Sequence, residues 1–200
     1  MAGIEVGQKA PPLRLPAGHG AEVGTEDYRD RNSLVVWFTK GMGCPFCRTQ
    51  MSQLARGYSR LHEAGAEVLQ VTPTQPERAR FYAKNFPIPF PYLCDPDYAA
   101  HRAWGLDVRS HSLAWYAKTF YAASRMPHPP PAEIGNPKMA LREMPTMLQD
   151  SDMGFFVLDR QGVVRYKHSG PYVGQHGLNT IPSVDDIVRQ LEQSARPRSA

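Results

Sequence analysis

A Cys-x-x-Cys pair, Cys44 and Cys47, lies between an apparent strand and an apparent helix, and it constrains the fold more than any other feature. Residues 34–38 (LVVWF) form a short β-branched and aromatic run, which is typical of a buried strand. After the pair, apolar residues recur at spacings of three and four, the stripe of an amphipathic helix: Cys47, Met51, Leu54, Tyr58 and Leu61. The sequence therefore predicts a strand over 34–39 and a helix from 45 to about 63, with the cysteines in the turn between them.

The residues around the pair favour a sharp turn into the helix. Gly41 and Gly43 permit unusual backbone angles, and Pro45 suits a first helical turn because its missing N–H would have no partner there. Cys44 is thereby placed at or just before the helix N-terminus, where N–H groups and the helix dipole stabilise a thiolate.

This placement predicts different roles for the two thiols. Cys44 is expected to be exposed, with a pKa lowered further by Lys40 and Arg48, which are close in sequence. Cys47 falls on the apolar stripe and is expected to be buried. We therefore predict Cys44 as the nucleophile and Cys47 as the resolving thiol of a disulfide exchange.

Other uses of the cysteines have less support. Zinc needs four ligands, and the seven histidines are dispersed with no second Cys-x-x-Cys, so no metal or other cofactor is expected. Cys94 has two interpretations, an ordinary small buried residue or a third redox thiol. Three cysteines are too few for a disulfide scaffold, and a close pair in a reducing compartment indicates redox chemistry.

Composition excludes some function classes. The net charge of +4 is mild and its basic residues are scattered, so no nucleic-acid partner is expected. No stretch approaches the roughly 20 apolar residues that cross a bilayer. Residues 1–6 lack the basic and apolar regions of an export signal, so a cytoplasmic location is expected.

Taken in order, the chain alternates strands and helices after an extended, proline-rich lead-in over residues 1–32, which is expected to include short strands. A strand over 67–72, a helix capped by Thr74 with Glu77, an extended piece over 91–94 and a helix ending near Gly105 follow. A hairpin over 154–168 and a final helix from Ser183 complete the pattern. We predict one domain over 1–195 and a tail over 196–200.

Residues 107–152 interrupt this pattern and are predicted to be an insertion. The aromatics there could cover one side of the sheet, or could form an interface that makes the chain a homodimer: Trp115, Tyr116, Phe120 and Tyr121. A third possibility is a non-catalytic adaptor that binds a partner through this segment, with vestigial cysteines.

The order of elements, with Cys-x-x-Cys after the first core strand, resembles a thioredoxin fold: α/β, with a central mixed sheet flanked by helices. Several segments are also similar to peroxiredoxin-like proteins of the AhpC/TSA family, and they cover most of the chain outside the insertion. They are residues 6–16 (VGQKAPPLRLP), 90–97 (FPYLCDPD), 104–106 (WGL) and 155–164 (FFVLDRQGVV).

The active-site positions match this family less well. Peroxiredoxins resemble one another in a Pro-x-x-x-Thr/Ser-x-x-Cys signature and an Arg before the strand that is 154–158 here. Counting from strand 34–39 places the peroxidatic cysteine on Cys47, but gives Lys40 at the Pro position, Cys44 at the Thr/Ser position and Met153 near the Arg position. The motif Cys44-Pro45-Phe46-Cys47 is instead similar to that of glutaredoxins and thioredoxin-like disulfide reductases. Met144-Pro145-Thr146 resembles the cis-proline motif of that fold, although it lies too far from the strand to predict a cis bond.

These resemblances imply a thiol oxidoreductase that cycles a Cys44–Cys47 disulfide. The substrate would be a disulfide, or a hydroperoxide with Cys47 as the peroxidatic thiol. Either reaction needs an external thiol reductant such as thioredoxin or glutathione.

Overall fold

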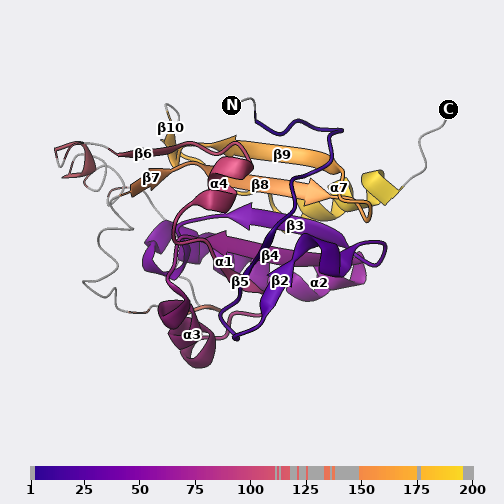
Figure 1. Cartoon of the computed structure of the whole chain (residues 1–200), viewed down its shortest axis with the longest axis horizontal. Helices are drawn as coiled ribbons and strands as arrows, with labels where there is room; N and C mark the ends of the chain where they lie inside the picture. The colour runs from indigo at the N-terminus through magenta and orange to yellow at the C-terminus, as the bar shows by residue number, and fades with distance from the viewer. Residues whose placement is uncertain are drawn as a thin grey trace.

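Five strands form the central mixed sheet of the computed structural model (Figure 1), in the order β5-β4-β3-β8-β9. The structure describes residues 3–110, 112, 114–117, 121, 125, 133–135, 137, 149–174 and 177–195. The strands are β3 (Ser33–Phe38), β4 (Ala66–Thr72), β5 (Tyr92–Cys94), β8 (Met153–Leu158) and β9 (Val164–Gly170). β3, β4 and β5 are parallel, whereas β8 and β9 are antiparallel to their neighbours, which confirms the predicted mixed sheet.

β3 is the central strand, and its sequence explains why. Residues 34–38 are all buried because both faces of the strand meet a hydrophobic layer. Val35 and Trp37 face one cluster, and Leu34, Val36 and Phe38 face the other. A strand buried on both sides needs a continuous apolar run, which is what residues 34–38 supply.

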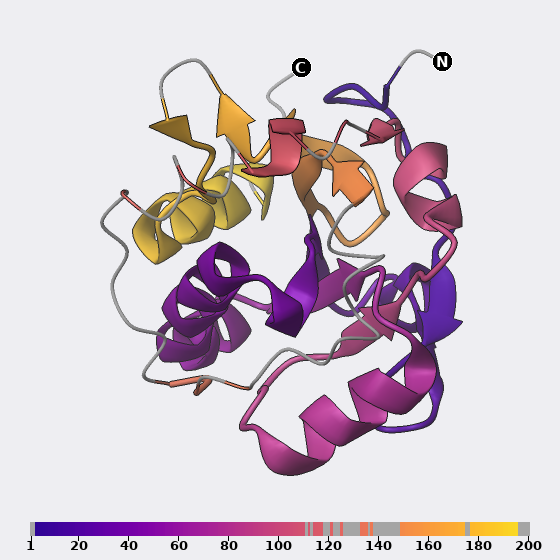
Figure 2. The same ribbon diagram turned by 90° about the vertical axis from the view of Figure 1, so that its left-hand side faces the viewer.

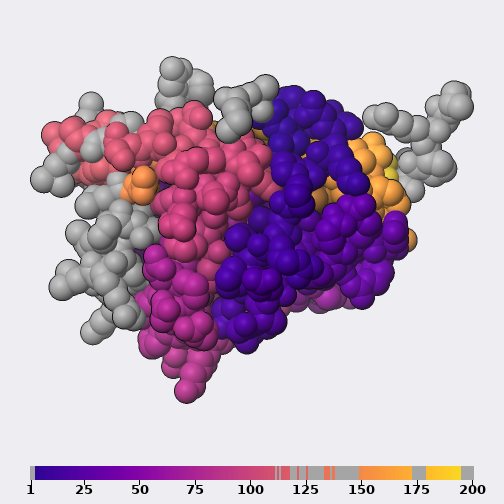
Figure 3. Space-filling view, in the orientation of Figure 1, coloured from indigo at the N-terminus to yellow at the C-terminus, as the bar shows by residue number. Residues whose placement is uncertain are grey.

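Helices cover both faces of the sheet (Figure 2). The first face carries α1 (Pro45–Arg56), α2 (Tyr58–Glu63) and α7 (Val184–Ala195). The opposite face carries α4 (Ala99–Ala103) and the N-terminal segment, whose pink and indigo atoms lie side by side on the front surface in Figure 3. That segment includes the hairpin of β1 (Arg14–Pro16) and β2 (Glu22–Gly24), followed by η1 (Thr25–Tyr28). α3 (Pro76–Asn85) lies beside β5.

Two helix predictions are corrected by packing. The helix predicted over 45–63 is two helices separated at Gly57, against which the side chain of Val184 packs. Thr74 does not cap α3, whose N-cap is Gln75; the Thr74 hydroxyl is instead hydrogen-bonded to the Tyr92 hydroxyl at 2.8 Å. The predicted cap of the last helix is confirmed, because Ser183 Oγ accepts the Asp186 N–H at 3.1 Å.

The ends of the 107–152 segment pair with each other. β6 (Val108–Ser110) runs antiparallel to β7 (Gln149–Ser151), at the left-hand end of the molecule in Figure 1. Trp115 and Tyr121 are 37% and 60% exposed, whereas Tyr116 is buried. Several residues named in the sequence predictions lie outside the described residues: Phe120, Met144, Pro145, Thr146 and the tail 196–200.

Two short strands, β10 (Val173–Gly174) and β11 (Gly177–Leu178), follow β9 as a small hairpin. Among the described helices, none combines the length and apolar character that a membrane crossing requires.

Candidate active site

The cysteine pair lies at the carboxyl end of β3, the end that faces the viewer in Figure 2. A single 3-10 turn, η2 (Gly41–Gly43), links β3 to α1. Cys44 is the N-cap of α1 and Pro45 occupies its first position, as predicted. The Cys47 N–H donates to Cys44 Sγ at 3.4 Å, so the two thiols lie against each other in the first turn.

The loop before Cys44 is held from two sides, by Tyr92 of β5 and by Arg48 of α1. Gly41 has φ +73°, and a Cβ there would collide with the Tyr92 hydroxyl, so this position requires glycine. That hydroxyl accepts the Met42 N–H at 3.1 Å. From α1, Arg48 Nη1 donates to the Met42 carbonyl at 2.7 Å. The loop is thus fixed to both β5 and α1 before the cysteines begin.

Both thiols are buried, which corrects the expectation that Cys44 is exposed. Cys44 is 5% exposed and Cys47 is fully buried. The reason is tertiary: the N-terminus of α1 packs against the sheet and against Tyr172, so that Cys44 joins the same hydrophobic cluster as Cys47.

The pKa values of the pair move in opposite directions. Burial, the largest effect, raises the pKa of Cys47, but hydrogen bonds from Cys44, Thr39, Tyr172 and the Lys40 backbone outweigh it and lower that pKa to about 7. The pKa of Cys44 rises well above its usual value, first because its thiol hydrogen-bonds Cys47 and then because of burial. The structure thus favours the thiolate on Cys47, whereas the sequence led us to expect it on Cys44.

Two cations lie near the thiols, as their sequence positions suggested. The buried Arg48 is close enough for its charge to interact with both sulfurs, although burial lowers the pKa of its guanidinium. Lys40 lies 5.3 Å from the centre of the Tyr172 ring, and its ammonium is 3.9 Å from an Asp150 carboxylate oxygen. The positive charge of Lys40 lowers the pKa of Cys44, but less than the other effects raise it.

Three functional neighbours were missed from the sequence: Thr39, Asp150 and Tyr172. Thr39 directly follows β3, and its side chain interacts with Cys47; the predicted strand over 34–39 already ended on this residue, but its polar side chain was not assigned to the site. Tyr172 meets Lys40 across 132 positions of sequence, and Asp150 lies in β7. No local pattern could have indicated these two contacts.

Met153 is the first residue of β8 and Cys94 is the last residue of β5. Gly154 pairs with Phe38, so Met153 opens β8 beside the end of β3, and it is buried and apolar close to the position at which an arginine was expected from the peroxiredoxin pattern. Cys94 ends β5, which β4 separates from β3. Burial raises the pKa of Cys94 to about 11, a value typical of an unreactive thiol, while its possible redox role stays a prediction.

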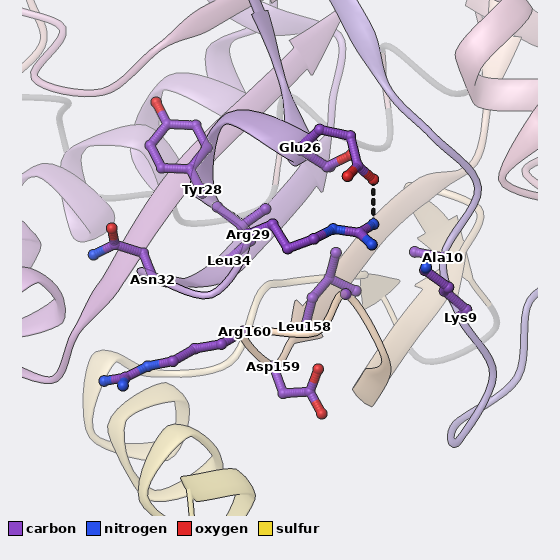
Figure 4. A pocket seen from close by; sticks show the side chains of 12 residues that line it. Lys9, Ala10, Glu26, Tyr28, Arg29, Asn32, Leu34, Leu158, Asp159 and Arg160 are labelled. Atoms are coloured by element: carbon purple, nitrogen blue, oxygen red, sulfur yellow. Dashed lines mark hydrogen bonds and ion pairs between the residues drawn. The ribbon is translucent and has the colours of Figure 1, made fainter.

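Two pockets lie away from the cysteines. The pocket in Figure 4 is at the opposite end of β3, beside Leu34, and its volume of about 20 Å³ suits roughly one water molecule. Arg29 crosses it to form an ion pair with Glu26. A larger pocket of about 420 Å³ lies between β8, β9 and α7, with Phe155 and Ile187 in its wall.

Within the part of the chain that the structure describes, no group of three or more His, Cys, Asp or Glu side chains is arranged to hold a metal ion. The three cysteines are all free thiols.

Comparison with known proteins supplies an independent observation. The model of the AhpC/TSA family matches residues 6–167. Among curated relatives, the peroxiredoxin Bcp of Bacillus subtilis is 29% identical over 101 residues, which are 50% of this chain and 64% of Bcp. Bcp of Escherichia coli K12 is 28% identical over 103 residues, covering 52% and 65% of the two chains. The chain thus spans less than two thirds of the length of the curated relatives it matches.

Solved structures agree on the fold. A reduced 2-Cys peroxiredoxin from Plasmodium vivax superposes with a TM-score of 0.62 at 15% identity, covering 94% of this chain and 95% of the other. The peroxidoxin BcpB of Mycobacterium tuberculosis gives 0.61 at 14% identity, covering 97% and 99%. At such identities the likeness shows the thioredoxin-like architecture alone.

Proposed function

The chain belongs to the AhpC/TSA family, and from this premise we propose that it is a thiol peroxidase in which Cys47 attacks a hydroperoxide and Cys44 resolves the product. The observation that carries the proposal is the hydrogen bonding around Cys47. Cys44, Thr39, Tyr172 and the Lys40 backbone all favour the thiolate form of Cys47, and together they outweigh burial and lower its pKa to about 7. This pKa favours the reactive thiolate at neutral pH far more than the usual thiol pKa does.

The proposed reduction of a hydroperoxide takes place in two steps on the two thiols, followed by reduction of the disulfide. The Cys47 thiolate attacks the terminal oxygen of ROOH, the O–O bond breaks, and Cys47 becomes a sulfenic acid while RO⁻ takes up a proton and leaves as ROH. Cys44 then attacks the sulfenic sulfur, which forms the Cys44–Cys47 disulfide and releases water. An external thiol reductant such as thioredoxin or glutathione returns two electrons and restores the dithiol.

In this chain, residues other than those of the peroxiredoxin pattern would stabilise the Cys47 thiolate. The Cys44 thiol occupies the position of the missing Thr/Ser hydroxyl and, with Thr39, donates to Cys47. Met153 cannot provide a guanidinium, but Arg48 places one near both sulfurs. A fixed positive charge there would stabilise the thiolate and the negative charge that develops on the departing oxygen.

Disulfide reduction through Cys44 is the second candidate. It is favoured by one observation, that Cys44 retains 5% exposure whereas Cys47 has none. A hydroperoxide as small as hydrogen peroxide needs less opening of this buried site than a protein disulfide, which must bring its own sulfur to the thiolate. For that reason we place peroxide reduction first.

The test compares the reduced wild type with Cys44→Ser, Cys47→Ser and Cys94→Ser, each mixed with hydrogen peroxide and, separately, with a small disulfide. We expect Cys47→Ser to lose peroxide reactivity and Cys44→Ser to accumulate a sulfenic acid on Cys47, trapped by dimedone and located by mass spectrometry. Cys94→Ser is the matched control and should react as the wild type does. If Cys47→Ser keeps its reactivity while Cys44→Ser loses it, Cys44 is the nucleophile. If neither Cys44 nor Cys47 reacts, the result supports the non-catalytic alternative, an adaptor that binds a partner protein.

We also propose a cellular compartment and an oligomeric state for the protein. Three free thiols suit a reducing compartment, and we propose the cytoplasm. The exposed aromatic side chains Trp115 and Tyr121 favour a homodimer through the 107–152 segment. Light scattering of the wild type and of Trp115→Ala/Tyr121→Ala should show a dimer that the double substitution dissociates; a wild-type monomer would refute it.

A further inference from the structure

Tyr172 reaches the cysteine pair from a distant part of the chain. It lies in the turn between β9 and β10, and its side chain is 7% exposed. The Lys40 N–H donates to its hydroxyl oxygen at 2.9 Å, and its ring belongs to the same hydrophobic cluster as Cys44 and Cys47. A phenol is therefore buried in the same cluster as the two sulfurs, hydrogen-bonded to the residue next to Thr39 and Gly41.

The direction of that hydrogen bond determines what the phenol can do. Because the Tyr172 oxygen already accepts from Lys40, its own proton is directed elsewhere. Cys47 Sγ is a neighbour that can accept it, and the interaction of the two groups favours the Cys47 thiolate. Burial and, after it, proximity to Cys47 raise the pKa of Tyr172 well above its usual value, so the phenol stays protonated and remains a donor.

From this geometry we propose that Tyr172 is a catalytic residue that donates a hydrogen bond from its phenol to the Cys47 thiolate, in a site where Met153 stands in place of an arginine. The proposal rests on the proposed role of Cys47 as nucleophile. No bond to Tyr172 is made or broken: the phenol stabilises the attacking anion and keeps its proton.

Charged residues hold the phenol in place. The Lys40 ammonium lies over the Tyr172 ring at 5.3 Å from its centre, and Asp150 holds that ammonium from β7. Among the described residues, Cys44 and Arg48 of the helix side also interact electrostatically with Cys47. The substitution Tyr172→Phe leaves these charged side chains in place and removes the phenol, together with the acceptor that it provides for the Lys40 N–H.

The experiment measures the pH dependence of Cys47 alkylation by iodoacetamide in a Cys44→Ser background, which leaves one thiol in the motif. Tyr172→Phe is compared with Tyr166→Phe, a control on β9 whose ring packs on Phe155. A hydrogen bond to a charged group is worth about one pKa unit or more. We therefore expect the midpoint to rise by about one pH unit in Tyr172→Phe, with roughly fivefold slower alkylation at pH 7 and an unchanged rate above pH 10. Tyr166→Phe should leave the midpoint where it is.

An unchanged midpoint in folded Tyr172→Phe would overturn the proposal. Should that variant fail to fold, difluorotyrosine at position 172 keeps the shape and strengthens the donor, and it should lower the midpoint; no shift would again overturn it. Alkylation needs no peroxide. A shifted midpoint in a protein that does not consume peroxide would therefore refute the proposed peroxidase and still support the hydrogen bond from Tyr172.

Discussion

The Sγ atom of Cys44 accepts the backbone N–H of Cys47 at 3.4 Å. One sulfur thus caps helix α1 and also lies beside the second sulfur of the pair. Capping and redox pairing follow from the same geometry, since a cap acts on a residue two or three positions further along the chain. The Cys-x-x-Cys spacing therefore places its two thiols in contact without any rearrangement of the fold.

The cap predicts different stabilities for two substitutions of Cys44. Serine can accept the same N–H, whereas alanine cannot. We expect Cys44→Ala to be about 1 kcal/mol less stable than Cys44→Ser in urea unfolding. Equal stability of the two variants would show that the sulfur contributes nothing as a cap.

The pKa of Cys47 predicts how reactivity and stability change with pH. Its alkylation rate should rise with a midpoint near pH 7 and fall about tenfold per unit below it, because only the thiolate reacts. A pKa lowered on folding from about 9 adds stability that is fully present above pH 9 and is lost as pH falls through 7. The difference in unfolding free energy between the wild type and Cys47→Ser should therefore grow from pH 6 to pH 9. A flat difference, or a midpoint near pH 9, would contradict this assignment.

The break between α1 and α2 depends on a close contact. A Cβ on Gly57 would lie 2.5 Å and 2.6 Å from the two methyl carbons of Val184. Gly57→Ala should therefore destabilise the protein by about 1–3 kcal/mol, despite the better helix propensity of alanine. Adding Val184→Ala removes both methyl groups, and a double-mutant cycle should recover part of the loss. Simple additivity of the two substitutions would mean that the contact is not the cause.

Asp95 and His101 form a buried pair that anchors α4. Asp95 accepts the N–H groups of Ala100 and His101 and the His101 ring nitrogen, the last at 2.6 Å. Asp95→Asn should cost about 3 kcal/mol, because an amide cannot accept all three donors. The exposed Asp97→Asn is the matched control and should have little effect.

The Asp95–His101 pair also predicts that the stability of the protein decreases at acidic pH. Burial raises the pKa of Asp95, but the hydrogen bonds from His101 and Ala100 outweigh it and hold that pKa below the usual 3.8. The stabilisation is thus present above pH 4 and lost as the carboxylate is protonated below it. The advantage of wild type over Asp95→Asn should shrink on acidification in this range; a constant advantage would rule out the ionised carboxylate as its source.

Several features could be predicted from the sequence because they are local. The apolar run at 34–38 identified the central strand, the hairpin over 154–168 followed from its turn, and Pro45 located the start of α1. Thr74 shows the limit of such reasoning. Its spacing to Glu77 suggested a cap, but the Tyr92 hydroxyl, 18 positions away in sequence, competes for the same side chain.

The sequence alone determined that two thiols sit at a strand-to-helix turn, since spacing, glycines and proline act over a few residues. Only the tertiary structure decided which thiol has the lower pKa. Helical spacing put Cys44 at the N-terminus, but the sheet buries it, and the donors that favour the thiolate gather on Cys47. One of these donors, Tyr172, lies 125 positions along the chain from that sulfur and meets it only when β9 joins the sheet. Long-range packing, which no short pattern encodes, sets the chemistry of the pair.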